Sequence, residues 1–284
     1  MAETIVVTGA TGNVGRELVP LLTGSGVAVR AVTRDPAAAA VPAGVEAVRA
    51  DLFDAATLDD AFAGADAVFL VWPSAEVGGA DAAVAAIARH ARRVVFLSAL
   101  GVPDADPAGE PPAGLFHGTV EWLIRRTGLE WTFLRAGGFA TNTLAWAEEI
   151  RATSEVRWVY GGAGRSLIHE ADIAAVAAKA LTEDGHEGRG YDLTGPSVVT
   201  QAEQVRLIGE AVDRELRWVE VSEEDARARM RDMGWPPGFI DSGLAHWKRI
   251  VTEPEPVTGT VERITGTPAR SFARWAREHA GAFG

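Results

Sequence analysis

The sequence predicts an α/β fold in which helices cover both faces of a parallel sheet. Short apolar runs alternate with longer amphipathic stretches through the first two thirds of the chain, and the links between them are short. Several of the runs are apolar at consecutive positions, as strands covered on both faces are. Alternating strands and helices are typical of βαβ units, whose right-handed crossovers place helices on both sides of the sheet.

The elements of this sheet can be placed from the apolar runs and the stretches between them. The runs predict strands at Thr4–Val7, Ala28–Val32, Glu46–Ala50, Ala67–Val71, Arg93–Leu97 and Trp131–Leu134. The amphipathic stretches predict helices at Val14–Thr23, Ala55–Phe62, Asp81–Arg89 and Thr119–Arg126. Proline, glycine and aspartate concentrate in Pro103–Gly114, which predicts a surface loop.

After about residue 140 the alternation weakens, and we expect a smaller C-terminal α+β region that caps the carboxyl edge of the sheet. Short strands are predicted at Trp158–Tyr160 and Gly190–Leu193, and Met233–Phe239 is a cluster of helix breakers. Helices are predicted at Glu170–Leu181, Gln201–Val212, Glu223–Met233 and Ser271–Ala280. The expected division is a sheet domain over residues 1–150, with later returns to the sheet, and a cap region over residues 151–284.

Composition excludes several classes of function. Lys and Arg number 27 against 39 Asp and Glu, a net charge of −12, which disfavours a broad nucleic-acid surface. There is no cysteine, so disulfides and thiolate chemistry are excluded, and the six histidines lack metal-ligand spacing, so no metal is expected. With no signal-like start and no apolar run of about 20 residues, we expect a cytoplasmic protein without a membrane segment.

The strongest motif is TGATGNVG at residues 8–15, between the first strand and the first helix. In this context Gly9 permits a tight turn, Gly12 lets the backbone approach a diphosphate, and Gly15 lets the helix pack on the sheet. The helix N-terminus would attract the anion. The motif predicts a Rossmann-type, doubly wound dinucleotide site at Gly9, Ala10, Thr11, Gly12, Asn13, Val14 and Gly15. The alternative is a glycine-rich turn without a ligand.

The end of the second strand favours NADP(H) over NAD(H). An NAD site usually has an acidic residue there, whereas this strand ends in Thr33 and Arg34. Arg34 could stack on adenine and pair with a 2′-phosphate, and Thr33 could donate its hydroxyl. Asp35 is expected to point away, and Asp51 with Leu52 to lie near adenine. Alternatively, Arg34 is a solvated surface charge.

At this point the chain resembles a known family, the NmrA-like, atypical branch of the short-chain dehydrogenase/reductases. The resemblance rests on TGATGNVG, TRDP (33–36), ADLFD (50–54), LDDAFAGADAVFLV (58–71), TGLEWTFLRAGG (127–138), IHEADIAAVAAKAL (168–181) and VERITGTPARSFARWAREHAGAF (261–283). Members include NAD(P)H:quinone oxidoreductases, azoreductases, benzylic-ether and isoflavone reductases, and non-catalytic NADP-sensing transcriptional co-regulators. The resemblance therefore implies the fold and the nucleotide more strongly than the reaction.

The superfamily's catalytic Tyr and Lys, four residues apart on a helix, have no counterpart here. Neither Tyr160 nor Tyr191 precedes a lysine at that spacing. Aligned on Thr127–Arg135, the Lys position falls on His117 and the Tyr position on Ala113. We therefore expect hydride transfer without the usual pair.

Two residues remain as catalytic candidates. His117, near a helix start, could act as an acid or base because imidazole titrates near neutrality, or it could make only a local hydrogen bond. Ser98 matches the superfamily's serine position and could orient substrate, or it could merely form a turn. Glu121, one helical turn after His117, is expected to be a structural partner.

The substrate pocket should lie outside the carboxyl ends of the strands. Val71, Trp72, Gly137, Gly138 and Phe139 are expected beside the cofactor. Residues expected to contact the substrate are Trp72, Phe116, Phe139, Asn142 and Trp235, with Trp146 and Phe239 as possible further aromatic walls. Tryptophans are more often core residues, which is the alternative for this set.

These observations lead to one expected function and two alternatives. We expect an NADP(H)-dependent oxidoreductase that reduces a planar, aromatic or conjugated small molecule such as a quinone, and that could form a homodimer. The missing Tyr–Lys pair also suits a non-catalytic NADP(H)-sensing regulator that binds a protein partner. A tailoring reductase or cyclase for natural products is the third possibility.

Overall fold

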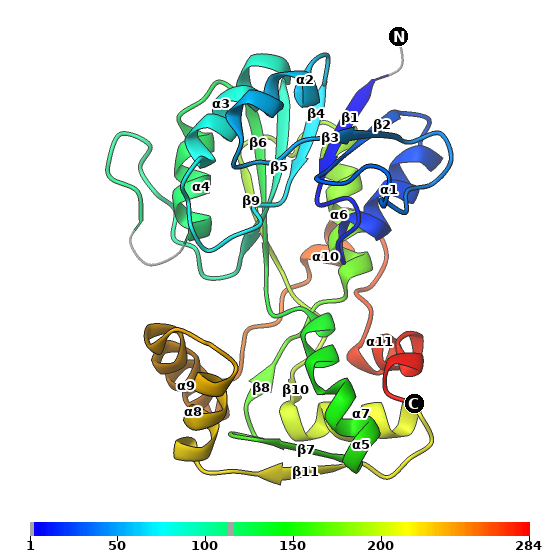
Figure 1. The fold of residues 1–284 in the computed structure, drawn as a ribbon, viewed down its shortest axis with the longest axis vertical. Helices are drawn as coiled ribbons and strands as arrows, with labels where there is room; N and C mark the ends of the chain where they lie inside the picture. Colours follow the sequence, from blue (N-terminus) through cyan, green and yellow to red (C-terminus); the bar gives the residue numbers. More distant parts are fainter. Residues whose placement is uncertain (1–2, 113–115) are drawn as a thin grey trace. The chain divides into compact units, whose positions relative to one another are not determined.

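A seven-stranded parallel sheet is the main element of the computed structural model, which describes residues 3–112 and 116–284 (Figure 1). Its strand order is β3-β2-β1-β4-β5-β6-β9. The strands are β1 (Thr4–Thr8), β2 (Ala28–Thr33), β3 (Glu46–Arg49), β4 (Ala67–Leu70), β5 (Arg93–Ala99), β6 (Glu130–Ala136) and β9 (Arg189–Leu193). The order runs outward in both directions from β1, which confirms the Rossmann-type, doubly wound α/β fold.

The centre of the sheet is apolar on consecutive positions, as predicted. Ile5 of β1 pairs with Val29 of β2 on one side and with Ala67 of β4 on the other. Ile5, Val6 and Val7 are completely buried. Helices cover both faces of this strand, so neither face of β1 reaches solvent.

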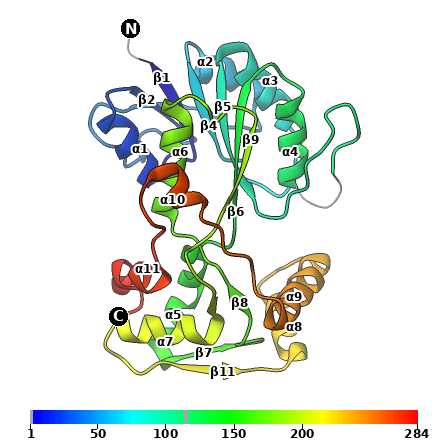
Figure 2. The same ribbon diagram turned by 180° about the vertical axis from the view of Figure 1, so that it is seen from behind.

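Two sets of helices cover the sheet (Figure 2). One face carries α1 (Gly15–Gly24), α6 (Glu170–Thr182) and α10 (Thr260–Thr265), with α6 packed on α1 and against β4, β5 and β6. Over the other face lie α2 (Leu58–Phe62), preceded by the 3-10 turn η1 (Ala55–Thr57), then α3 (Ala80–His90) and α4 (Phe116–Arg125). Leu58, Phe62, Val84, Ile87 and Ile124 of these three helices share one buried core with the sheet.

The chain forms two compact units, each assembled from more than one segment. The first unit runs up to Gly137 and adds Glu170–Leu193 and Thr260–Thr267, which bring α6, β9 and α10 to the sheet. The second comprises Gly138–His169, Thr194–Gly259 and Pro268–Gly284. The functional division expected at residue 150 stays a prediction.

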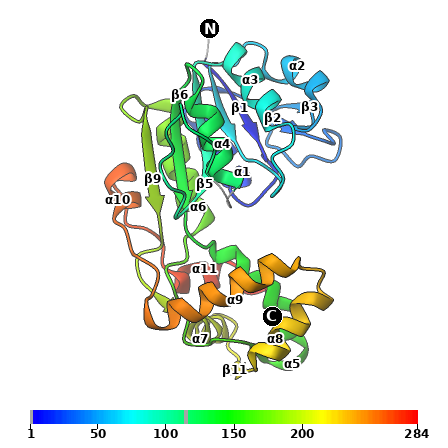
Figure 3. The same ribbon diagram turned by 90° about the vertical axis from the view of Figure 1, so that its left-hand side faces the viewer.

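The second unit combines two small sheets (Figure 1) with several helices (Figure 3). Its strands are β7 (Glu155–Trp158), parallel to β11 (Arg217–Glu220), and β8 (Gly164–Arg165), antiparallel to β10 (Val199–Thr200). Its helices are η2 (Ala140–Trp146), α5 (Ala147–Thr153), α7 (Gln201–Ala211), α8 (Glu223–Asp232), α9 (Pro237–Thr252), α11 (Phe272–Glu278) and η3 (Ala280–Ala282). Trp275 is fully buried in this unit, while α8 packs beside α9 around a smaller core.

One predicted strand of this region was misplaced, and one helix was not predicted. The strand predicted at Trp158–Tyr160 lies at Glu155–Trp158, because Tyr160 adopts a left-handed φ of 59° that ends it. The breaker cluster Met233–Phe239 contains the start of α9, a helix that the sequence pattern did not reveal. Among the described residues, no helix combines the length and apolarity needed to cross a bilayer.

Candidate functional site

The loop between β1 and α1 has a backbone that only glycine allows at two positions. Gly9 has a φ of +63°, and the amide of Gly12 donates to its carbonyl oxygen at 2.9 Å. A Cβ on Gly15 would lie 2.2 Å from that same oxygen and 2.6 Å from Cα of Ala10. The loop therefore turns tightly back onto the first turn of α1, and any side chain at residue 15 would force them apart.

The N-terminus of α1 follows directly on this loop. Val14 occupies the N-cap position, and its own side chain makes no capping hydrogen bond. Arg16, in the first turn, donates from Nη2 to Oδ1 of Asn13 at 3.0 Å and from Nε to the carbonyl oxygen of Gly12 at 3.3 Å. A helix N-terminus with a guanidinium beside it favours an anion.

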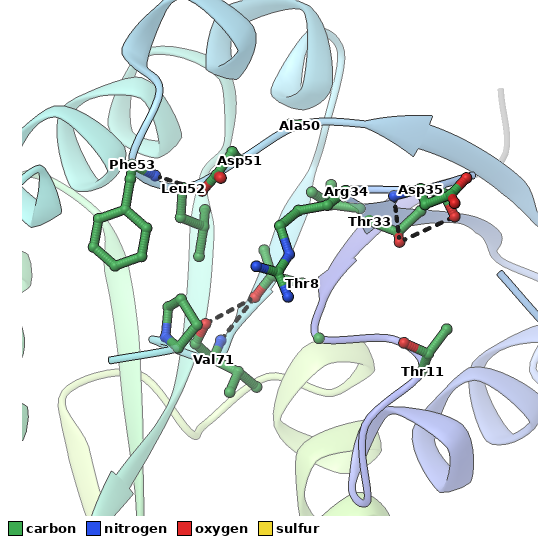
Figure 4. A pocket seen from close by; sticks show the side chains of 13 residues that line it. Thr8, Thr11, Thr33, Arg34, Asp35, Ala50, Asp51, Leu52, Phe53 and Val71 are labelled. Atoms are coloured by element: carbon green, nitrogen blue, oxygen red, sulfur yellow. Dashed lines mark hydrogen bonds between the residues drawn. The ribbon is translucent and has the colours of Figure 1, made fainter. Parts of the chain in front are cut away.

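A cavity of about 420 Å³ opens at the carboxyl ends of β1 to β4 (Figure 4). The hydroxyl of Thr8 fixes one wall, because it donates to the carbonyl oxygen of Phe69 at 3.1 Å and accepts from the amide of Val71 at 2.8 Å. The expected cofactor residues that line the cavity are Gly9, Thr11, Thr33, Arg34, Asp51, Leu52 and Val71. They come from four separate loops, and the fold brings them together.

Arg34 extends into this cavity, and Asp35 also lines it, although its carboxylate is turned away from the Arg34 guanidinium (Figure 4). Oδ1 of Asp35 accepts hydrogen bonds from the amides of Ala37 and Ala38, at 3.1 and 3.3 Å. The carboxylate is thereby held by its own turn. Sequence reasoning missed Phe53, a 47 % exposed ring that also lines the cavity and directly follows the expected pair Asp51 and Leu52.

Three of the expected cofactor residues pack inward. Ala10 and Val14 are buried, so only their backbone can serve a ligand. Trp72 is 5 % exposed within the core, its indole N–H donates to the carbonyl oxygen of Glu76 at 2.7 Å, and its ring meets Phe53 edge-on. The placement of Trp72 argues against its role as a pocket wall and favours the core alternative.

The residues that follow β6 make backbone hydrogen bonds and close packing contacts within their own units. The amide of Gly137 donates to the carbonyl oxygen of Leu193 at 2.9 Å. In the second unit, Gly138 leaves room for the guanidinium of Arg165, which would lie 2.0 Å from a Cβ, and Phe139 pairs with Ile168. Also in that unit, Asn142, Trp235 and Phe239 are exposed, and Trp146 packs edge-on against Trp218. Cofactor and substrate roles for these residues stay predictions.

Ser98 belongs to a buried network of charged groups in the first unit. Its hydroxyl donates to Oε1 of Glu121 at 2.6 Å, and both residues are nearly inaccessible. Arg135 donates to both oxygens of Glu121, at 3.0 and 2.6 Å, and to Asp104 at 2.8 Å. Glu121 is thus held as a structural partner, and Ser98 has its only proton directed at that carboxylate.

His117 lies in the first turn of α4 and is largely buried. Its ring stacks on Phe116 with centroids 3.7 Å apart, and its buried Nδ1 has no hydrogen-bond partner among the described residues. Burial lowers the pKa of His117 to about 4. At neutral pH the imidazole is uncharged. The expectation that His117 acts as an acid or base relied on titration near neutrality, and that support is lost. Ala113, the aligned Tyr position, lies outside the described residues.

Burial of His117 should make the protein more stable as the pH rises from about 4 to 6.5. In this window the unfolded chain binds a proton at His117 and the folded chain does not. The free energy of unfolding is therefore about 3 kcal/mol lower at pH 4 than at neutral pH because of this residue. His117→Phe should flatten this part of the pH profile of unfolding free energy, measured with urea. Phe116→Leu, which keeps the imidazole, should retain the slope. An unchanged slope in His117→Phe would contradict the assignment.

Together, the sheet order, the glycine loop and the cavity at the switch point define a Rossmann-type dinucleotide-binding protein. A family model described as NAD(P)H-binding matches residues 9–184. The chain belongs to this NAD(P)H-binding family.

Relatives along the whole chain are named as reductases. The chain is 39 % identical to the (4-alkanoyl-5-oxo-2,5-dihydrofuran-3-yl)methyl phosphate reductase of Streptomyces griseus, over 98 % of this chain and 99 % of that protein. It is 35 % identical to an NAD(P)H azoreductase of Xenophilus azovorans, over 99 % of both chains. Quinone oxidoreductase 2 of Escherichia coli is 32 % identical over 84 % of both. The chain is accordingly an NAD(P)H-dependent oxidoreductase.

Solved structures agree with this assignment. The NADPH complex of an NADPH-dependent quinone oxidoreductase from Escherichia coli has a TM-score of 0.79 at 26 % identity, covering 96 % of this chain and 99 % of that one. NmrA, a negative transcriptional regulator in complex with NADP, has a TM-score of 0.70 at 20 % identity, covering 98 % and 95 %. The latter likeness shows the fold alone.

Proposed function

We propose that this chain uses NADPH to reduce a planar, conjugated small molecule such as a quinone, without a Tyr–Lys pair. The observation that carries the proposal is the chemistry shared by its relatives. An azo compound, a quinone and an acylated dihydrofuranone are all conjugated acceptors. Hydride addition to such an acceptor leaves a delocalised anion, which needs less help from a protein acid than a simple alkoxide does.

The glycine loop and the adjoining cavity fit a dinucleotide. Gly15 leaves a cradle that a Cβ would fill, and the N-terminus of α1, where the N-cap Val14 has no capping side chain, suits a diphosphate. The apolar side of the cavity, with Leu52 and Phe53, suits adenine. Bound nicotinamide supplies the hydride, while the chain's own residues bind and orient.

Neither His117 nor Ser98 is placed to act as a proton donor at neutral pH. With a pKa of about 4, His117 is uncharged at neutral pH, so its imidazole can offer a neutral N–H but has no extra proton to give to a substrate. Ser98 is buried and donates its hydroxyl proton to Glu121, so it supplies no proton to a substrate. In this proposal the proton that completes reduction comes from water.

The two tyrosines provide a direct test of reduction without a phenolic acid. The hydroxyl of Tyr160 donates to Glu223 at 2.6 Å, and that of Tyr191 lies 2.9 Å from Nδ1 of His186. The double variant Tyr160→Phe with Tyr191→Phe should keep kcat for quinone reduction within about threefold of wild type, because a lost general acid typically costs about 10² or more. A hundredfold loss of kcat in the folded variant would contradict the proposal.

NADPH oxidation with a panel of quinones, azo dyes and unsaturated lactones tests the function itself. We expect turnover with at least one conjugated acceptor and none with simple ketones. Tight NADPH binding without turnover on any acceptor would instead favour the sensing regulator. The homodimer stays a prediction, which the molar mass in solution would decide.

A further inference from the structure

A second cavity adjoins the first on the other side of the second strand's end. Its volume is about 530 Å³, and it shares Thr11, Thr33 and Asp35 with the first. The run Ala38–Ala40 lines it with small side chains, and Arg16 is the one positively charged residue among the described residues that line it. It is therefore an open, polar space with a single guanidinium.

The two arginines of the region lie in different cavities. Arg34 lines the first cavity, which Leu52 and Thr8 also line, and its side chain extends into that cavity (Figure 4). A planar guanidinium next to an apolar wall suits the face of a purine ring. Arg16 lines the second cavity together with Thr11 and Thr33.

Arg16 is also held in place by the phosphate loop. Its bonds to Asn13 and to the carbonyl oxygen of Gly12 involve Nη2 and Nε, while a guanidinium carries five N–H donors in all. Asp35 opposes an anion in this cavity, but its Oδ1 already accepts from the amides of Ala37 and Ala38. A positioned guanidinium, two hydroxyls and small neighbours are what a phosphate monoester requires.

We infer that Arg16 binds the 2′-phosphate of NADPH while Arg34 stacks on its adenine. This division of roles rests on the proposed use of NADPH, and it assigns cofactor specificity to a residue of α1 instead of to the end of β2. Because Arg16 is exposed, its replacement should leave the fold intact.

The test is calorimetric binding of 2′,5′-ADP and 5′-AMP, which differ only in the 2′-phosphate, to the full chain. Arg16→Gln should weaken the binding of 2′,5′-ADP about tenfold or more, because it removes one charge-assisted contact, and should leave the affinity for 5′-AMP unchanged. Arg34→Gln should weaken the binding of both ligands by a similar factor. Arg16→Lys, the matched control, should keep most of the preference for 2′,5′-ADP.

The outcomes separate this inference from the proposed function. If wild type prefers 2′,5′-ADP and Arg16→Gln keeps that preference, the inference is overturned. It is equally overturned if Arg34→Gln alone removes the preference. If the expected pattern appears but no acceptor supports NADPH oxidation, the inference stands and the proposed reduction fails.

Discussion

Gly15→Ala is expected to reduce NADPH affinity by about 100-fold or more and to lower the free energy of unfolding by about 3 kcal/mol. The added Cβ would lie 2.2 Å from the carbonyl oxygen of Gly9 and 2.6 Å from Cα of Ala10. Both neighbours are backbone atoms, so no side chain can rotate to relieve the overlap. The loop has to move away from α1, and the cradle between them is lost.

Gly24→Ala is the matched control for this variant. Gly24 ends the same helix, and its added Cβ meets nothing within 4 Å. We expect unchanged NADPH affinity and equal or slightly higher stability, because alanine favours a helix. Fluorescence titration with NADPH and urea unfolding of both variants provide the comparison. Equal affinity in the two would show that the loop does not cradle the cofactor.

Glu121→Gln is expected to destabilise the protein by about 3 kcal/mol. The carboxylate is 1 % exposed and accepts from Ser98 and twice from Arg135. The amide keeps the shape but removes the charge. Among the described residues, the largely buried guanidinium of Arg135 then keeps Asp104 as its anionic partner. Removing one partner of a buried ion pair lowers the free energy of unfolding by more than the intact pair contributes to it.

Glu210→Gln serves as the control for the loss of an ion pair. Glu210 pairs with Arg206 one turn earlier in α7, and both side chains are more than half exposed. Its replacement should cost less than about 1 kcal/mol. Urea unfolding of both variants at neutral pH checks the difference, and costs of similar size would mean that the buried network adds no more than a surface pair.

Sequence reasoning found the elements whose signal is local. The loop at residues 8–15 carries its own glycine pattern, and the central strands β1, β4 and β5 have uninterrupted apolar runs. By contrast, α9 was hidden because Pro236 and Pro237 were interpreted as breakers, although Pro237 stands at the first position of that helix, where proline is tolerated.

The candidate site could be predicted only in part for the same reason. The cavity residues from β1, β2 and the loops after β3 and β4 follow from the rule for switch points in such sheets. The bonds between Ser98, Glu121 and Arg135 join residues far apart in sequence, and nothing local marks them. Burial of Trp72 and of His117 depends on the packing of several elements, which no single stretch of sequence reports.

The late arrival of β9 in the sheet has a consequence during synthesis. As the ribosome releases the chain, β6 emerges with one edge unpaired, and its neighbour follows only once the chain has been made as far as Leu193. Between the two comes Gly138–His169, which belongs to the other unit. A nascent chain therefore carries an open, apolar sheet edge for part of its synthesis, the state in which chaperones protect growing polypeptides from one another.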